Sequence, residues 1–216
     1  MTQHTRQNPS PRYQELVALY RTMHIEGEQF LNVPPEETFP GFNLLREAPR
    51  IKRLIQLTGS ELILDYGSGK GQQYEVSPVL IAGEKWPSVV EYWDISEVQC
   101  YDPAYLPFST LPTQPFDGVV STDVLEHCPE EDIHWILDEM FCLAKNFVYA
   151  NIACYPAKKR LPTGENAHCT IKDITWWQEH IQAVTAAHPD VHSEIWLQFI
   201  DSAKPGELQE IKLGRS

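Results

Sequence analysis

The sequence predicts an α/β fold in which about seven strands form a mostly parallel sheet flanked by helices. Short apolar runs alternate along the chain with longer segments whose apolar residues recur at helical spacing, which is typical of strand–helix–strand units. One apolar run, at 61–66, ends directly in a glycine-rich turn, as a buried strand does before it leads into a helix. With 216 residues, 42% of them hydrophobic, the chain can bury one substantial core.

Residues 1–58 predict a helical cap on a single compact unit formed by residues 59–216. Apolar residues recur at near-helical spacing over 11–26 and again over 44–57, and Gly59 provides a stop for the second helix. The two helical segments are separated by residues that break helices, namely Pro34, Pro35, Pro40 and Gly41. We expect these N-terminal helices to cover the ligand site at the strand ends.

Within the compact unit, apolar runs and helical periodicity predict the remaining elements in order. Strands are expected at 61–66, 98–101, 116–121, 146–154, 191–200 and 207–213, and helices at 130–143 and 170–187. A further helix is expected after the glycine-rich turn, with Pro78 limiting its length. The last two strands are expected to form a hairpin around Lys204-Pro205-Gly206. The segment 83–96 predicts no definite element.

The composition disfavours several classes of function. The formal net charge is -13, and an acidic surface repels phosphate backbones, so we expect no long nucleic acid as a partner. No apolar run approaches the ~20 residues that a membrane span requires. Residues 1–10 predict a frayed polar tail without the apolar core of a signal peptide, so we expect a cytoplasmic protein. The five cysteines form no Cys-x-x-Cys pair, which favours reduced thiols over a zinc site.

The glycine-rich turn is the most informative motif of the chain. Residues 63–71 read ILDYGSGKG, so that an apolar strand reaches Asp65 and glycines follow at alternate positions. Glycine permits positive φ and close approach of the backbone to a ligand, and a following helix start offers unpaired N–H groups. Asp65 stands at the strand tip, where its carboxylate can face a cationic group. The spacing differs from the G-x-G-x-x-G fingerprint of dinucleotide-binding turns.

This string of apolar strand, aspartate and glycines resembles motif I of the class I S-adenosylmethionine (SAM)-dependent methyltransferases. The resemblance extends over about residues 60–155. Phe116-Asp117-Gly118-Val119-Val120 is similar to the start of the family's strand 4, and Asp123-Val124-Leu125-Glu126-His127 is similar to the motif that ends it. The resemblance implies a Rossmann-like sheet, a SAM-dependent methyltransferase domain at 59–216, and SAM as cofactor. It implies the following cofactor-binding residues: Asp65, Tyr66, Gly67, Ser68, Gly69, Gly71, Asp102, Pro103, Asp123 and Val124.

Asp102 ends the expected strand at 98–101, where the family resemblance implies an acid that accepts both hydroxyls of a ribose. The alternative is that Asp102 only forms a turn before Pro103. The chain departs from the family between 103 and 115, where a short segment leads directly to the strand at 116–121. The usual third strand must therefore be shortened or absent, and the resemblance assigns no adenine contacts.

Asp123, Glu126 and His127 place three potential metal ligands within five residues, and His168 follows the strand at 146–154. Two carboxylates and two imidazoles can bind Mg²⁺, Mn²⁺, Fe²⁺ or Zn²⁺. The spacing is similar to the Glu-x-x-Glu-His metal motif of ubiquinone-biosynthesis O-methyltransferases and small-RNA 2′-O-methyltransferases, with Asp123 in place of the first glutamate. The alternative is a metal-free site, because Leu-Glu-His also occurs in methyltransferases that bind no metal.

The resemblance and this cluster together predict methyl transfer to a small-molecule acceptor, at a hydroxyl of a sugar, a sugar nucleotide or a phenol. A hydroxyl must lose a proton, so His127, His168 and Glu126 are the expected catalytic residues, acting through a bound metal ion or as general bases. Three alternatives stay open: N-methylation of a small amine, a SAM-binding module without catalysis, and a dehydrogenase.

Two further motifs have both an ordinary and a functional interpretation. The basic run Lys158-Lys159-Arg160 is either a solvated loop or a clamp for a phosphate or carboxylate of the acceptor. The pair Trp176-Trp177 either packs in the core or supplies one wall of the acceptor pocket.

Overall fold

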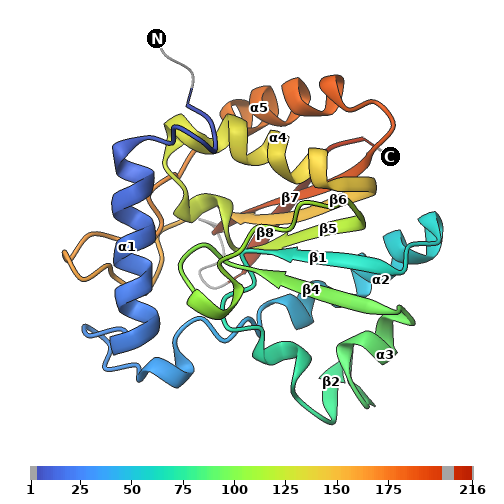
Figure 1. Ribbon diagram of the computed structural model, residues 1–216, viewed down its shortest axis with the longest axis horizontal. Helices are drawn as coiled ribbons and strands as arrows, with labels where there is room; N and C mark the ends of the chain where they lie inside the picture. The colour runs from blue at the N-terminus through green and yellow to red at the C-terminus, as the bar shows by residue number, and fades with distance from the viewer. Residues whose placement is uncertain (1–3, 201–206, 216) are drawn as a thin grey trace.

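The computed structural model describes residues 4–200 and 207–215, and in this part of the chain a six-stranded sheet forms the centre of the molecule (Figure 1). The strand order is β4-β1-β5-β6-β7-β8, in which every neighbouring pair is parallel except β7 and β8. The strands are β1 (Leu62–Tyr66), β4 (Glu97–Tyr101), β5 (Phe116–Thr122), β6 (Ala144–Ala153), β7 (His192–Ile200) and β8 (Leu208–Leu213). The predicted α/β class with a mostly parallel sheet is confirmed, with six strands in the central sheet where about seven were expected.

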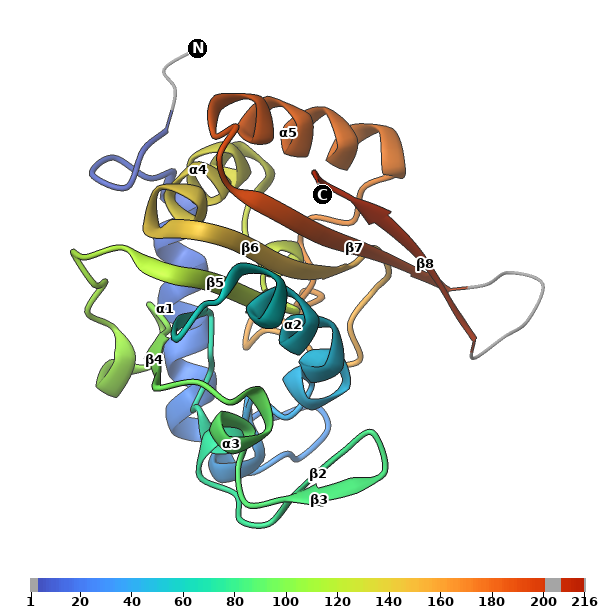
Figure 2. The same ribbon diagram turned by 90° about the vertical axis from the view of Figure 1, so that its right-hand side faces the viewer.

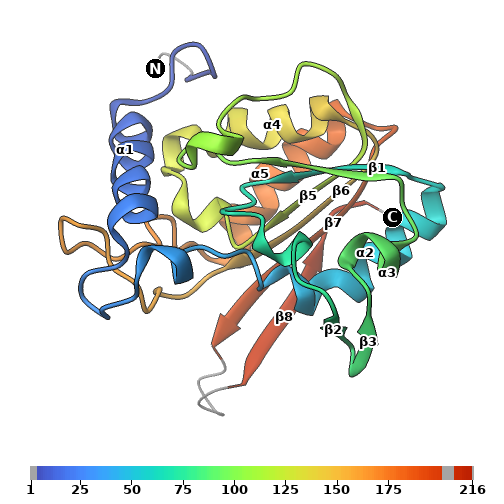
Figure 3. The ribbon, with the colours of Figure 1, turned by 60° about the horizontal axis from the view of Figure 1, so that its bottom comes forward.

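Helices cover both faces of the sheet (Figures 1 and 2). One face packs against α4 (Ile133–Leu143) and α5 (Ile174–Ala187), and the other against α2 (Leu44–Thr58) and α3 (Val89–Trp93). The long helix α1 (Pro11–Glu26) belongs to neither layer. It stands against the carboxyl ends of β1 and β4, beside the loop that follows β6 (Figures 1 and 3). Of the two predicted N-terminal helices, α1 thus covers the strand ends, while α2 is part of a sheet-covering layer.

Local sequence explains where the helices begin and end. The Ser10 side chain accepts a hydrogen bond from the backbone N–H of Tyr13, and Pro11 occupies the first turn of α1, where a missing N–H costs nothing. Gly59 ends α2 in the left-handed conformation, as predicted. Asp173 caps the start of α5 through the N–H of Trp176.

The segment after the glycine-rich turn differs from the prediction. The expected helix is wrong: only a single 3₁₀ turn, Gln72–Tyr74, follows Gly71. The Gln72 N–H donates to the Pro40 carbonyl of the segment between α1 and α2, and Pro78 follows closely, so the turn does not continue as an α-helix. The chain continues into a separate two-stranded hairpin, β2 (Val79–Ile81) and β3 (Glu84–Trp86).

Two other expectations from the sequence concern the connection between β4 and β5 and the pairing of β7 with β8. Between β4 and β5 the chain forms only a 3₁₀ turn, Leu106–Phe108, so the third strand of the family pattern is absent from this segment. The strands β7 and β8 pair antiparallel, whereas the expected turn at 204–206 lies outside the described residues. No described helix combines the length and the apolar character that crossing a bilayer would require.

The strand order creates a crevice at the carboxyl ends of β1 and β5. From β1 the chain passes to β4 on one side of the sheet and then returns to β5 on the other side, so the winding changes direction between β1 and β5. In open α/β sheets, ligands bind at such a switch point. The segments that follow β1, β4 and β5 are therefore the place to look for a functional site.

The polar N-terminal residues are not a frayed tail where the structure describes them. The Arg6 guanidinium donates to Glu139 of α4 and to the hydroxyls of Tyr66 and Tyr101, at the tips of β1 and β4. It also lies over the Trp135 ring, with 5.0 Å between the guanidinium carbon and the ring centroid. This residue therefore fastens the segment before α1 to the strand tips and to α4.

Arg6→Ala is expected to lower the free energy of unfolding by about 2 kcal/mol, because Glu139 and two tyrosine hydroxyls lose a mostly buried partner. Urea denaturation measures the change. The matched control is Arg12→Ala, which removes more exposed pairs with Glu15 and Glu165 and should cost less than about 1 kcal/mol. Equal effects of the two substitutions would contradict the fastening role.

Candidate functional site

The glycine-rich turn directly follows β1, and the protein itself occupies its backbone donors. The N–H groups of Gly67 and Ser68 donate to the Tyr101 carbonyl, and that of Gly69 donates to the Asp102 carboxylate. The next two N–H groups of the turn are also paired, donating to the carbonyls of Phe39 and Ser68. The expected set of unpaired N–H groups is therefore not present.

The positive φ of Gly69 serves packing against the cap. A Cβ atom added there would lie 2.4 Å from the carbonyl oxygen of Phe39, in the segment between α1 and α2. The sequence attributed the glycines to close approach of a ligand, whereas at Gly69 the closest atoms belong to the chain. The turn and the cap segment thus fit together only because position 69 has no side chain.

Asp65 is buried, and only one of its two carboxylate oxygens accepts hydrogen bonds from the described residues. Its Oδ2 accepts hydrogen bonds of 2.9 Å from the Gln73 amide and the Tyr74 hydroxyl. Its Oδ1 has no hydrogen-bond partner among the described residues. Burial raises the pKa of Asp65 to about 7, and these two donors offset only part of that rise. Asp65 therefore presents a buried acceptor that ionises near neutral pH.

Asp102 forms the turn that the alternative interpretation described. Its Oδ1 accepts from the N–H groups of Ala104 and Tyr105, at 2.8 and 3.2 Å, and its Oδ2 accepts from Gly69 at 3.0 Å. Burial raises the pKa of Asp102 to about 6. Oδ2 accepts only one of these bonds, so the carboxylate retains acceptor capacity for a ligand.

Two adjoining cavities open at the carboxyl ends of the strands. The inner cavity, of about 120 Å³, is mostly apolar and lies under α1, against Asp102, Pro103 and Val124. The outer cavity, of about 670 Å³, lies between the 37–43 segment, the end of β6 and the loop that follows β6. The residues that line both cavities are Phe39, Gly67, Gly69, Asp123 and His127.

Asp123 follows β5 with a positive φ of 54° and is held on both oxygens. Its Oδ2 accepts from the Asn43 amide at 2.7 Å, and its Oδ1 accepts from the Asn151 amide of β6. Burial raises its pKa. Of the four predicted metal ligands, Asp123 is the one that the structure leaves outside the cluster formed by the other three.

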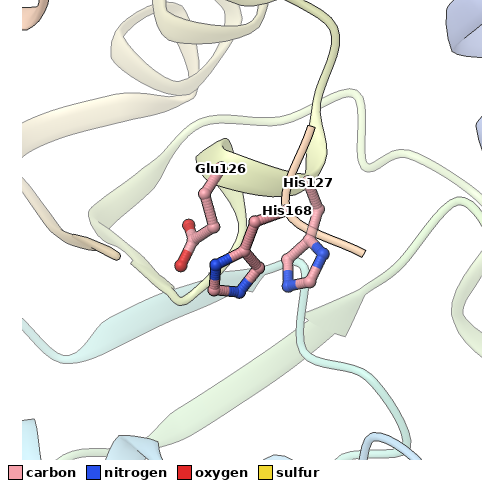
Figure 4. A group of neighbouring side chains, drawn as sticks. All are labelled: Glu126, His127 and His168. Atoms are coloured by element: carbon pink, nitrogen blue, oxygen red, sulfur yellow. The ribbon is translucent and has the colours of Figure 1, made fainter. Parts of the chain in front are cut away.

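Glu126, His127 and His168 do come together (Figure 4). One potential ligand atom of each lies within 4.8 Å of the others, and the His168 ring lies between the Glu126 carboxylate and the His127 ring. Glu126 is fully buried, and its Oε1 accepts from the Ala153 N–H at 3.0 Å. Its Oε2 has no hydrogen-bond partner in the described part of the chain. Burial raises the pKa of Glu126 well above its usual range.

Hydrogen bonds to backbone carbonyls fix the protonation of both histidines. His168 Nδ1 lies 2.5 Å from the Tyr155 carbonyl oxygen, which only accepts, so Nδ1 has the proton. His127 Nδ1 lies 3.0 Å from the Ala167 carbonyl and 2.8 Å from the Tyr20 hydroxyl, which itself donates to Ala167 at 2.6 Å. A proton on His127 Nδ1 satisfies all three contacts. Each ring is therefore left with a lone pair on Nε2.

Burial and the neighbouring His168 ring lower the pKa of His127 to about 3, and burial lowers the pKa of His168. His127 should therefore be neutral at pH 6, with the proton on Nδ1, and His168 should take up its second proton at a lower pH than an ordinary histidine. Long-range ¹H–¹⁵N spectra of histidine-labelled protein between pH 4 and pH 9 measure this directly. The solvent-exposed His134 provides the internal control. An imidazolium signal from His127 at pH 6 would contradict the assignment.

Comparisons with protein-family models, with curated proteins and with solved structures found no match for this chain. Sequence reasoning missed three residues that shape the site: Tyr20 on α1, Asn43 at the start of α2, and Asn151 within β6. The only signal in the sequence was Asn151, a polar residue inside an otherwise apolar run. Tyr20 was counted as one apolar position of a helix, and nothing marked Asn43.

Proposed function

We propose that the chain is a SAM-dependent methyltransferase that acts on a hydroxyl of a small-molecule acceptor. The observation that supports this most strongly is the pair of adjoining cavities, which meet at Gly67, Asp123 and His127. Methyl transfer needs a donor and an acceptor held in line within van der Waals contact, because an activated sulfonium requires mainly positioning. Two cavities that share one wall satisfy that need.

The donor side suits SAM better than a dinucleotide. The apolar inner cavity with Asp102 suits a nucleoside, and the free Oδ1 of Asp65, which lines the outer cavity where the two cavities adjoin, can accept from the ammonium group of the methionine part. A dinucleotide brings a pyrophosphate that needs free backbone N–H groups. Those of the glycine-rich turn are already paired, which argues against the dehydrogenase alternative.

On the acceptor side, the neutral histidines favour a hydroxyl over an amine. A hydroxyl must lose a proton during transfer, and the Nε2 lone pair of His168 can receive it, whereas His127, with a pKa of about 3, is a weak base at neutral pH. An amine that is already deprotonated needs no such base. The bonds from Nδ1 to backbone carbonyls hold both rings in place with their Nε2 lone pairs free.

The cluster also fits a divalent metal ion. One potential ligand atom each of Glu126, His127 and His168 lies within 4.8 Å of the others, and Oε2 of buried Glu126 is unpartnered among the described residues. Each histidine Nδ1–H donates to a carbonyl, as in protein metal sites, which leaves Nε2 for the ion. Glu126, His127 and His168 would hold the ion, and Asp123 would not. Such an ion lowers the pKa of a bound hydroxyl.

Calorimetric titration with S-adenosylhomocysteine tests the donor site. We expect micromolar binding to the wild type, weakened tenfold or more, about 1.4 kcal/mol, in Asp65→Asn. Asp117→Asn, at the opposite end of the sheet, is the control and should leave the affinity unchanged. Failure of the wild type to bind would refute the proposed function.

The pH dependence of that binding follows from the pKa of Asp65, which burial raises to about 7. Because only the ionised carboxylate attracts an ammonium, affinity should fall roughly fivefold from pH 7 to pH 6, and Asp65→Asn should remove this dependence. The raised pKa has the opposite effect on the ligand-free fold. The stability contribution of Asp65 is full below its unfolded pKa and is lost as pH rises to about 7.

A further inference from the structure

The basic run Lys158-Lys159-Arg160 forms no salt bridge with a carboxylate in the described part of the chain. The chain contains 30 acidic residues against 17 lysines and arginines, and eight of the cations that the structure describes pair with a carboxylate. Each of the following, for example, pairs with a glutamate: Arg6, Arg12, Arg46, Arg50 and Arg53. Lys159 instead lies over the Phe39 ring, and the Arg160 guanidinium donates only to the Gly164 carbonyl.

Two of these cations line the outer cavity. Lys158 and Lys159 lie on its wall together with His127 and His168. Burial lowers the pKa of Lys159, because burying its charged ammonium group is unfavourable in free energy. A bound anion would offset that unfavourable free energy. Arg160 does not line the cavity.

The loop that presents the lysines is held in a defined shape. The Asn166 side chain exchanges two hydrogen bonds of 2.9 Å with the backbone of Ala157, and the Ala167 N–H donates to the Lys159 carbonyl. The same loop supplies His168, whose neighbour Cys169 donates its N–H to the Glu126 carbonyl. Lys158, Lys159 and His168 therefore lie on one hydrogen-bonded loop, which fixes the distance between the lysines and His168.

The acidic groups near the cavity form no ion pair with these lysines among the described residues, although Glu28 acts electrostatically on Lys159. Asp65 and Asp123 line the cavity, but both accept hydrogen bonds from other side chains. Glu28 lies near Lys159, and its two oxygens accept from the backbone N–H groups of Arg160 and Leu31. Glu37 is exposed at the cavity rim.

We infer that the acceptor carries a carboxylate or phosphate group, which Lys158 and Lys159 bind while the hydroxyl points toward His127 and His168. The part of the acceptor between these groups can be apolar or aromatic, because Phe42, Tyr155 and Ile200 also line the outer cavity, beside polar residues such as Asn43 and Thr122. The position of the hydroxyl rests on the proposed function. The anion site does not, because it stands on the lysines and the cavity alone.

Inorganic phosphate is the probe for the anion site. Titrated into the wild type, it should shift the His168 ring signals in a saturable manner, and its dissociation constant should rise tenfold or more in the Lys158→Gln/Lys159→Gln variant. Lys145→Gln, which changes a lysine paired with Asp117 at the other end of β6, is the matched control and should behave as the wild type. A titration without shifts, or equal affinities for all three proteins, would overturn the anion site.

Turnover distinguishes the two anions and separates this inference from the proposed function. Phenols and sugars are offered with SAM in matched sets: with a carboxylate, with a phosphate, and with the neutral ester or hydroxyl in its place. Anionic members should be preferred, and Lys159→Gln should raise their KM tenfold or more while kcat is retained. Preference for the neutral members would overturn the inference. Lysine-dependent phosphate binding without methylation would uphold the anion site and count against the methyltransferase.

Discussion

A chain in which His168 is replaced by alanine is expected to lose methyl transfer by a factor of about 10²–10⁴ while it still binds S-adenosylhomocysteine. His168 contributes an Nε2 lone pair to the cluster with Glu126 and His127, and it lines the outer cavity but not the inner one. Its loss therefore removes a proton acceptor or metal ligand without disturbing the donor side. Release of S-adenosylhomocysteine from the matched acceptor sets measures the rate, and calorimetry measures the affinity.

The same variant distinguishes the two mechanisms of the cluster. Where a divalent ion is held by all three residues, Mn²⁺ affinity should fall tenfold or more in His168→Ala. Where the histidines act as bases alone, Mn²⁺ should leave the wild-type rate unchanged. His134→Ala, an exposed histidine on α4, is the control. Unchanged turnover in His168→Ala would refute the assigned role, and a parallel loss of S-adenosylhomocysteine binding would indicate a structural one.

Gly69→Ala is expected to destabilise the fold by about 2–4 kcal/mol and to abolish S-adenosylhomocysteine binding. A left-handed alanine costs about 1–2 kcal/mol, and the new methyl group would meet the Phe39 carbonyl oxygen at 2.4 Å. The segment 37–43 would have to move, which also breaks the hydrogen bond from the Lys70 N–H to that carbonyl. Because Phe39 lines both cavities, the displacement reaches the donor and acceptor sides together.

Gly59→Ala is a matched control for this substitution. Gly59 has a φ of 63°, close to the 60° of Gly69, but nothing lies within 4 Å of its added Cβ. It should therefore lose about 1 kcal/mol and bind S-adenosylhomocysteine as the wild type does. Urea denaturation of both variants separates backbone strain from contact with Phe39. Equal losses in the two would show that the contact has no energetic role.

The layers of the fold could be predicted from periodicity, because apolar residues must face the sheet. The helix α2 and the parallel strands β1, β4, β5 and β6 follow from that rule, and the stop of α2 follows from the freedom of Gly59 to adopt the left-handed conformation. The short 3₁₀ turn after Gly71 did not follow, since its path depends on tertiary hydrogen bonds to the cap segment, such as that from Gln72 to Pro40. The local sequence pattern contains no information about hydrogen-bond partners that are distant in the sequence.

The candidate site could also be predicted only in part. The proximity of Glu126, His127 and His168 could be predicted, because residues that follow neighbouring parallel strands meet at one edge of a sheet. The sequence did not separate Asp123 from them, because that separation depends on the Asn43 and Asn151 amides, which are distant in sequence. The sequence also did not show that the backbone N–H groups of the glycine-rich turn donate to other groups of the chain. This pairing changes the class of ligand that the turn suits.

The position of α1 has a consequence for how the chain folds during synthesis. Tyr20 donates to the carbonyl of Ala167, which is 147 positions later, and Arg6 reaches Glu139. At ordinary rates of translation, α1 therefore waits on the order of ten seconds before these partners emerge from the ribosome. Its buried side chains, Leu16 and Met23, stay solvent-exposed during that interval. This helix is made well before the partners that hold it, so it docks only after they emerge, and Leu16 and Met23 are accessible to chaperones until then.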